Sequence, residues 1–343
     1  MIKHTYTEKS EINFSKLEER ILSINNPEIN RASEIRKLLY ELLVVNKPTL
    51  IMATGGSKII AYYLQLILER MKMDGLICEV IEPRDYFYKF NKNSFSNLVT
   101  ISASGNTNGI KEALDDFNGN KYLICEKEKE ADYEVFVWGN NLYDREKSFI
   151  SLATSLGPIS LLLSATCYLE KDITSKELTK INDKIKKLLE LSARKIEKLD
   201  RSFVNTNLIQ VLSGYDTKCS SSILESNLVE SGVCPVIVHD KGSYCHGRSN
   251  LLFRNPESYM IYLSHIEREL DKVLLDSIQN EYSNIYIFDS KDIDDNYFWK
   301  EYYLMLQMYY LSKKIADDKN IDLTQPEYNE NVVRKLYKFR GGM

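Results

Sequence analysis

The chain has 343 residues, of which 43% are hydrophobic and 27% are charged, and this is enough apolar material for two packed domains of ordinary size. The composition excludes a disordered or fibrous protein. The 45 basic side chains are outnumbered by 49 acidic ones, so the chain lacks the basic excess that binding to a nucleic-acid backbone requires. We therefore expect no nucleic-acid partner.

The first 46 residues are expected to form leading helices. Their apolar residues recur at helical spacing, and no strand signal interrupts them. The positions that carry this pattern are Leu17, Ile21, Leu22, Ile35, Leu38, Leu39 and Leu42. The first twenty residues contain no apolar core region, so they do not resemble a secretory signal peptide.

From Thr49 onward, short apolar runs alternate with longer segments of helical spacing. The runs TLIMAT, GLICEVIEP, NLVTISAS and KYLICEK have the length of strands, whereas KIIAYYLQLILERM and NGIKEALDDF have the spacing of helices. This alternation is typical of β–α–β units around a mostly parallel sheet. It predicts a first α/β domain over residues 47–172.

Within this domain, residues 149–169 form an uncharged stretch of 21 residues, which is near the length of a membrane-spanning helix. Its Gly157-Pro158 break and its six Ser and Thr residues favour a buried helix of a soluble protein instead. Proline is common in the first turn of a helix, so we expect this helix to start near Pro158. No membrane association is expected.

The next 27 residues, 174–200, lack Gly and Pro and carry a Leu/Ile stripe between lysines and glutamates, which predicts a connecting helix over 173–200. Beyond it the alternation restarts with NLIQVLSG, CSSSILESNLVES, CPVIVHD, YMIYLSH, a helix near 265–279, and NIYIFD. We predict a second α/β domain over 201–320. A polar tail, 321–343, follows it, and no packed element is expected there before Val332.

The six cysteines predict neither a disulfide framework nor a metal site. They contain no C-x-x-C pair and form no His/Cys cluster at zinc spacing. They stand at positions 78, 125, 167, 219, 234 and 245. We expect reduced thiols in a cytoplasmic protein, with no metal and no cofactor.

Two strand-to-helix turns of the first domain are rich in small residues, MATGGSK at 52–58 and ISASGNTNG at 101–109. Ligands of open α/β sheets bind at the carboxyl ends of strands. Neither turn is a G-x-x-x-x-G-K-[ST] or a G-x-G-x-x-G loop. Hydroxyls and the N–H groups of a helix starting near Thr107 can bind phosphate oxygens. The alternative is that Ser57 and Thr107 only cap helices.

The hexapeptide Ser-Ala-Ser-Gly-Asn-Thr at 102–107, with Gly-Gly-Ser at 55–57 after an earlier strand, resembles the sugar isomerase (SIS) domain family. The resemblance implies an α/β fold of two SIS-type domains, each a mostly parallel sheet flanked by helices. It also implies that the phosphate of a small phosphosugar is bound by Gly56, Ser57, Ser102, Ala103, Ser104 and Thr107. The second domain has no equally regular turn, although residues 211–221 carry hydroxyls.

The second half resembles the isomerase half of glucosamine-6-phosphate synthases, because Glu230 stands sixteen residues before a His246-Gly247 dipeptide. The resemblance implies that Glu230 moves a proton between C1 and C2 of the sugar and that His246 helps to open the ring. The alternatives are a solvated glutamate and a structural histidine. Near the end of the chain, the Leu-x-Lys pattern at 336–338 implies an active-site role for Lys338. Lys335 is the competing candidate, and a solvated basic tail is the alternative.

Three positions depart from the synthase pattern. Ser243 stands where the synthases have a glutamate, and Asn227 and Val229 replace lysines of the catalytic helix. About 48 residues precede the first strand and residue 2 is isoleucine rather than the nucleophilic cysteine of glutaminase domains, so we expect no glutaminase domain.

The resemblance as a whole implies an enzyme that acts on a phosphosugar through an enediol or enolamine. It is either an aldose–ketose isomerase or a deaminase or deglycase of an aminosugar or fructosamine phosphate, and sequence alone does not separate these reactions. One alternative is a non-catalytic phosphosugar sensor or regulatory protein. A less favoured one is an etherase that cleaves a sugar lactyl ether. SIS proteins associate, so a homodimer or a higher homo-oligomer is expected.

Overall fold

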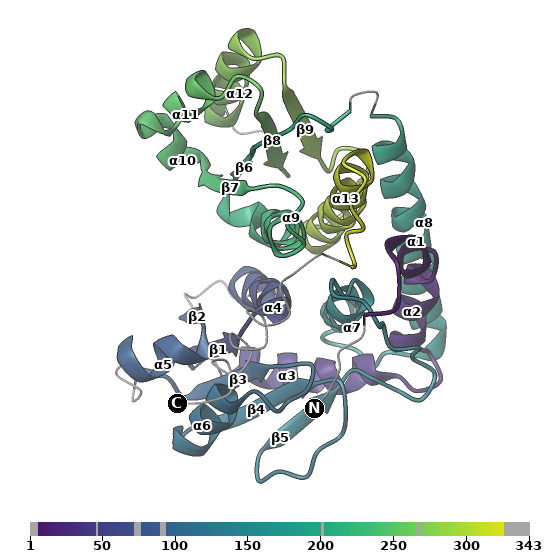
Figure 1. Ribbon diagram of the computed structural model, residues 1–343. Coiled ribbons are helices and arrows are strands. Elements are labelled where there is room, and N and C mark those ends of the chain that lie inside the picture. The colour runs from purple at the N-terminus through teal and green to yellow at the C-terminus, as the bar shows by residue number, and fades with distance from the viewer. Residues whose placement is uncertain are drawn as a thin grey trace. The chain divides into compact units, whose positions relative to one another are not determined.

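The structure is a computed structural model, and it describes residues 6–45, 47–71, 77–89, 94–199, 202–265 and 269–325. The chain divides into two compact units, each built around one sheet (Figure 1). The first-sheet unit contains residues 14–146 and 151–184. The second-sheet unit contains residues 6–13, 147–150 and 185–325. The domain boundaries predicted above remain predictions.

The first sheet has five strands in the order β2-β1-β3-β4-β5, and every neighbouring pair is parallel. All five residues of β1 and of β3 are buried, as expected of strands covered on both faces. The strands are β1 (Thr49–Ala53), β2 (Cys78–Ile81), β3 (Asn97–Ile101), β4 (Asn120–Cys125) and β5 (Glu134–Val137). The predicted α/β architecture is confirmed for this half.

Helices cover both faces of the first sheet (Figure 1). On one face, α3 (Arg31–Val45), α4 (Ser57–Met71) and α7 (Ala153–Cys167) pack against one another. On the other face, α5 (Pro83–Lys89) and α6 (Asn108–Asp116) bury a core of aliphatic and aromatic side chains. The leading helices α1 (Ser10–Ser15) and α2 (Leu17–Ile24) were also expected, and α2 packs on α7.

The uncharged stretch forms the buried helix α7, but the expected start near Pro158 is wrong. The helix begins at Ala153, and Pro158 lies inside it. The early start has a physical cause in Glu146, a buried residue whose carboxylate accepts the N–H groups of Leu152, Ala153 and Thr154 at 2.8, 3.0 and 2.9 Å. Among the residues described, no helix is both long and apolar enough to cross a membrane.

We expect Glu146→Ala to lower the free energy of unfolding by at least about 2 kcal/mol, because three N–H groups at the start of α7 lose their acceptor in a buried place. Urea unfolding followed by circular dichroism measures this. The control is Glu112→Ala, which removes an exposed glutamate of α6 and should change stability by less than about 0.5 kcal/mol. Equal stability of the two variants would contradict the capping role.

The second sheet has four parallel strands in the order β7-β6-β8-β9, which repeats the order β2-β1-β3-β4 of the first sheet. The strands are β6 (Ile209–Ser213), β7 (Val236–Asp240), β8 (Tyr259–Ser264) and β9 (Ile285–Asp289). The two halves of the chain therefore share one architecture.

Two long helices, α9 (Lys218–Glu230) and α13 (Tyr297–Asp318), pack together and contact the second sheet. Side chains from the 244–252 segment and from α12 (Glu269–Glu281) bury a separate core against β6 and β8. The remaining elements are a 3-10 turn (Tyr215–Thr217), α10 (Lys241–Ser243), a π-helical turn (Tyr244–Arg248) and α11 (Asn250–Arg254). The predicted connecting helix corresponds to α8 (Ser175–Glu197), whose residues up to Lys184 belong to the first-sheet unit.

The start of the polar tail is packed, contrary to expectation. Leu323 and Thr324 are fully buried. The backbone carbonyl of Leu323 accepts a hydrogen bond from the Ser231 hydroxyl at 2.7 Å, and the Asp322 carboxylate accepts one from the Ser10 hydroxyl at 2.6 Å. These polar residues are buried because partners elsewhere in the unit satisfy their hydrogen bonds. Lys335 and Lys338 lie outside the described residues.

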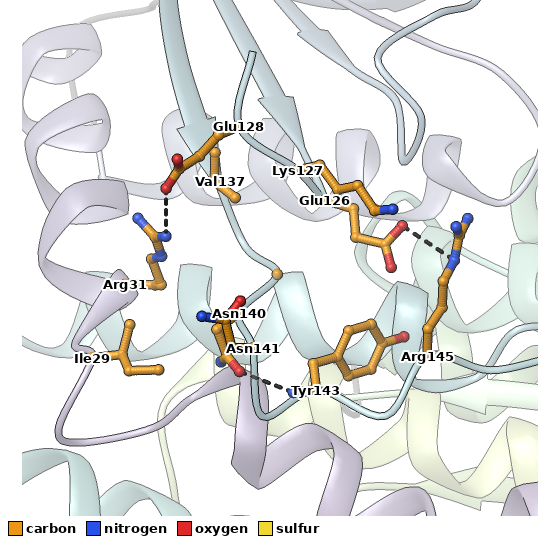
Figure 2. A pocket seen from close by; sticks show the side chains of 11 residues that line it. Ile29, Arg31, Glu126, Lys127, Glu128, Val137, Asn140, Asn141, Tyr143 and Arg145 are labelled. Carbon is orange, nitrogen blue, oxygen red and sulfur yellow. Dashed lines mark hydrogen bonds and ion pairs between the residues drawn. The ribbon is translucent and has the colours of Figure 1, made fainter.

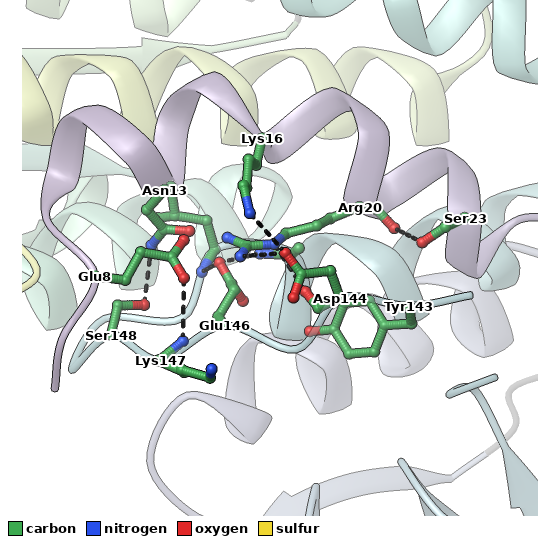
Figure 3. Close-up of polar contacts among 12 residues, drawn as sticks. Glu8, Asn13, Lys16, Arg20, Ser23, Tyr143, Asp144, Glu146, Lys147 and Ser148 are labelled. Atoms are coloured by element: carbon green, nitrogen blue, oxygen red, sulfur yellow. Dashed lines mark hydrogen bonds and ion pairs between the residues drawn. The ribbon is translucent and has the colours of Figure 1, made fainter. Parts of the chain in front are cut away.

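Polar contacts hold the segment that joins β5 to α7 (Figure 3). Arg20 of α2, whose side chain is only 1% exposed, donates to the backbone oxygen of Asp144 through Nε at 2.8 Å and to its carboxylate through Nη2 at 3.2 Å. Lys16 donates to the same carboxylate at 2.8 Å, and this bond lowers the pKa of Asp144. Residues around Asp144 are therefore fixed in place.

Candidate functional site

The two small-residue turns lie side by side at the carboxyl edge of the first sheet. Strands β1 and β3 are parallel neighbours, and Ala53 pairs with Ile101 at their last residues. The chain leaves the sheet from both strands at this level, into the turns 54–57 and 102–107. Because β2 and β3 flank β1 on opposite sides, this is the point where strand order reverses, and such points are ligand sites in open α/β sheets.

Hydroxyl groups converge in the 102–107 turn. The Oγ atom of Ser102 lies 3.2 Å from Oγ1 of Thr107 and accepts a hydrogen bond of 3.2 Å from the Gly105 N–H. Ser104 Oγ accepts from the Asn106 N–H at 3.1 Å. Ser104 is exposed, Thr107 is half-buried and Ser102 is buried, so the three hydroxyl-bearing side chains differ in their exposure to solvent.

Helix capping does not account for the hydroxyls of Ser57 and Thr107. Thr107 is the N-cap residue of α6, yet its side chain accepts no N–H group of that helix. Ser57 is the first residue of α4, and within the described residues its half-buried hydroxyl has no hydrogen-bond partner. Neither hydroxyl caps its helix, and that of Thr107 contacts the Ser102 hydroxyl of the same turn, which favours the binding interpretation over the capping one.

The structure adds a cation that the sequence reasoning missed. Lys129, which follows β4, donates from Nζ to the Gly105 carbonyl oxygen at 2.7 Å and to Oδ1 of Asn106. Burial lowers the pKa of Lys129, and the charge of Lys111 lowers it further. The available signal was the charged run EKEKE at 126–130, directly after a strand, because β4 is the neighbour of β3. A positive charge at this turn would favour a bound phosphate.

The backbone conformation of the turn favours glycine at position 105. Its φ of +57° lies in the left-handed region, where side chains are strained. A Cβ atom there would also stand 2.8 Å from Cε of Lys129. The glycine thus lets the turn reverse while the lysine packs on it.

Glu230 and His246 both lie in the second-sheet unit. Glu230 is the last residue of α9 and is exposed, and its carboxylate accepts a hydrogen bond of 2.7 Å from the Ser226 hydroxyl. His246 is exposed in the 244–248 turn and precedes Gly247, whose φ is +91°. Within the described residues no hydrogen bond joins Glu230 to His246. Their catalytic roles, like that of Lys338, therefore stay predictions.

Another titratable cluster of this unit fits a structural role. His265 Nε2 lies 2.7 Å from a carboxylate oxygen of Glu301, and its Nδ1 lies 3.1 Å from the Ser290 hydroxyl. The second oxygen of Glu301 accepts the Ser220 N–H at 2.9 Å. Both ring nitrogens are satisfied and both side chains are fully buried, so the network joins β8, α9 and α13 rather than facing a ligand.

The thiols and carboxylates show no sign of a metal centre in the described residues, where no three His, Cys, Asp or Glu side chains are grouped to hold an ion. All six cysteines are free of disulfide bonds in the structure. Burial raises the pKa of Cys78 and Cys219, which makes these two thiols poor nucleophiles.

No family model and no curated protein matches the sequence. Solved structures do match. A candidate phosphosugar isomerase from Clostridium difficile 630 has a TM-score of 0.71 at 17% identity, with 96% of this chain and 98% of that chain covered. The chain has a double-SIS fold.

Two further structures share this double-SIS fold. The tagatose-6-phosphate ketose/aldose isomerase from Escherichia coli has a TM-score of 0.69 at 13% identity, covering 96% of this chain and 98% of that chain. The C-terminal domain of the glucosamine-fructose-6-phosphate aminotransferase from Francisella tularensis has a TM-score of 0.68 at 17% identity, covering 95% and 100%. Such identities establish the fold alone.

Proposed function

We propose that this double-SIS protein is an enzyme that binds a phosphosugar and shifts a proton between its C1 and C2 carbons. The observation that carries the proposal is the pair of adjoining turns at the strand-order reversal, where the hydroxyls of Ser57 and Thr107 are not used as helix caps. The proteins that share the fold are named for phosphosugar and aminosugar-phosphate chemistry, which supports the same substrate class.

In the proposed mechanism the first-sheet unit holds the phosphate. The hydroxyls of Ser57, Ser102, Ser104 and Thr107 donate to its oxygens, the backbone at Gly56 and Ala103 lines the turn, and Lys129 adds positive charge. A phosphate fixed in this way anchors the sugar at the end opposite C1 and C2, so binding energy far from the reacting carbons is used for positioning.

The proton transfers are assigned to Glu230 and His246 on the resemblance of this segment to the synthases. His246 assists ring opening by exchanging a proton with the ring oxygen and the C1 hydroxyl. Glu230 then removes a carbon-bound proton, giving an enediol from a sugar phosphate or an enolamine from an aminosugar phosphate, and returns it to the neighbouring carbon. Lys338 is proposed as an additional active-site cation. Isomerisation, deamination and deglycation share these steps.

The proposal is tested by isotope exchange. The protein is incubated in deuterium oxide with a panel of hexose and aminohexose 6-phosphates, and proton NMR follows loss of the C1 and C2 signals. We expect exchange with at least one phosphorylated sugar and none with its unphosphorylated counterpart. If the protein binds a phosphosugar tightly but exchanges no carbon-bound hydrogen for deuterium over hours, it is a sensor rather than an enzyme.

One observation favours that second candidate, a phosphosugar-binding sensor or regulatory protein without turnover. Asn227 stands where the synthases have a catalytic-helix lysine, and it is buried and donates to the Ser312 hydroxyl at 3.3 Å. Asn227 therefore contributes to packing within the unit and does not supply the charge that the lysine of the synthases carries.

We further propose that the chain forms a homodimer, because SIS proteins associate and the His-Gly loop of the family commonly reaches the neighbouring subunit's site. Multi-angle light scattering should give about twice the 39.9 kDa mass of one chain. An active, stable monomer would contradict this expectation.

A further inference from the structure

The first-sheet unit contains a pocket of about 750 Å³ that none of the proposed catalytic or phosphate-binding residues lines (Figure 2). Its walls come from residues 126–128 after β4, residues 137–145 at the end of β5 and beyond, and Ile29 and Arg31 at the start of α3. This volume is in the range of small-molecule sites. The proposed function therefore does not explain this pocket.

Two ion pairs lie on opposite sides of the pocket, with Asn140 and Tyr143 between them (Figure 2). Arg31 pairs with Glu128 at 3.3 Å. Arg145 pairs with the buried Glu126 at 3.3 Å through Nε, so its two terminal nitrogens lie outside this bond. The contacts of Arg20 and Lys16 with Asp144 hold the backbone that carries Tyr143 and Arg145.

One cation of the lining is not paired with a carboxylate. Arg31 pairs with Glu128 and also with Glu34 at 3.0 Å, and Arg145 pairs with Glu126, so the excess positive charge is that of Lys127. In the part of the chain that the structure describes, the Lys127 ammonium has no hydrogen-bond or ion-pair partner. Arg31, although its side chain is 18% exposed, keeps a buried Nε without a hydrogen-bond partner among those residues. Such a surface suits an anion.

We propose that this pocket is a second ligand site, for a phosphorylated polyhydroxy compound, separate from the 102–107 turn. Lys127 and the terminal nitrogens of Arg145 would bind the phosphate. The carboxylates of Glu126 and Glu128 would accept hydrogen bonds from the hydroxyls of the ligand.

The pocket adjoins the turn, so the alternative is one extended site that holds a single ligand. The Glu126 N–H donates to the Ala103 carbonyl oxygen at 3.1 Å, and Lys129 donates to Gly105. Lys127 therefore lies between two residues that contact the turn. The number of ligands bound per chain separates two sites from one.

The test is calorimetric titration of the full chain with glucitol 6-phosphate, a phosphorylated polyol that lacks a carbonyl and cannot be isomerised. We expect two molecules per chain. Lys127→Glu should weaken one binding event at least tenfold and leave the other, whereas the control Lys180→Glu, a charge reversal on exposed α8, should change neither. Inorganic phosphate should compete at the pocket and unphosphorylated glucitol should not.

Binding that Lys127→Glu leaves unchanged would overturn the proposal, as would a single event per chain that is weakened both by Lys127→Glu and by Ser104→Ala with Thr107→Val, because that result indicates one extended site. Failure of the proposed function looks different. In that case one event per chain would remain, which Lys127→Glu removes and which Ser104→Ala with Thr107→Val leaves intact.

Discussion

Replacing Ser104 by Ala together with Thr107 by Val should weaken binding of a sugar phosphate by about 100-fold or more and leave the fold intact. Each lost hydrogen bond to a charged phosphate oxygen costs about 1.5–3 kcal/mol, which is roughly 10- to 150-fold in affinity. Ser104 is exposed, and its hydroxyl accepts only the Asn106 N–H, so its loss leaves no buried group unsatisfied. Thr107→Val keeps the shape of the side chain.

Calorimetric titration with hexose 6-phosphates and with the unphosphorylated sugars measures this effect. The matched control is Ser33→Ala, which removes a half-buried hydroxyl from α3 of the same unit and should leave affinity unchanged. If the wild-type protein bound a phosphorylated sugar and its unphosphorylated form equally well, the turn would not be a phosphate site.

Replacing Glu230 by Gln should lower turnover by roughly 10²–10⁴, the usual contribution of a general base, with little change in ligand affinity. Glutamine keeps the shape of the side chain and can still accept the Ser226 hydroxyl, but it cannot take up a carbon-bound proton. Since Glu230 is exposed at the end of α9, the substitution should not disturb the core.

The measurement is deuterium incorporation at C1 or C2, with steady-state kinetics beside it. Glu225→Gln is the control, because it changes a half-buried glutamate of the same helix. His246→Asn should slow the reaction mainly for the cyclic form of the substrate, since an open-chain form needs no ring opening. Exchange by Glu230→Gln at the wild-type rate would exclude this residue as the base, and loss of exchange only in Glu225→Gln would move the role to Glu225.

The architecture of both sheets could be predicted from the amino-acid sequence. A buried parallel strand reads as a short apolar run and its crossover helix as a longer amphipathic segment, so TLIMAT and NLVTIS were recognisable as β1 and β3 without any tertiary contact. The small-residue turn after β3 was equally readable, because its hydroxyls and its left-handed Gly105 are contiguous in the chain. Features formed by residues within six positions of one another can be recognised without knowledge of the fold.

Features made by residues far apart in the chain could be recognised only in the three-dimensional structure. Lys129 reaches the turn because β4 pairs with β3, and α7 starts before Pro158 because Glu146 accepts its first N–H groups. Leu323 is buried in a polar tail because Ser231 bonds to its carbonyl. Each outcome depends on desolvation and hydrogen-bond geometry between distant segments, and neither periodicity nor composition encodes which partners will meet.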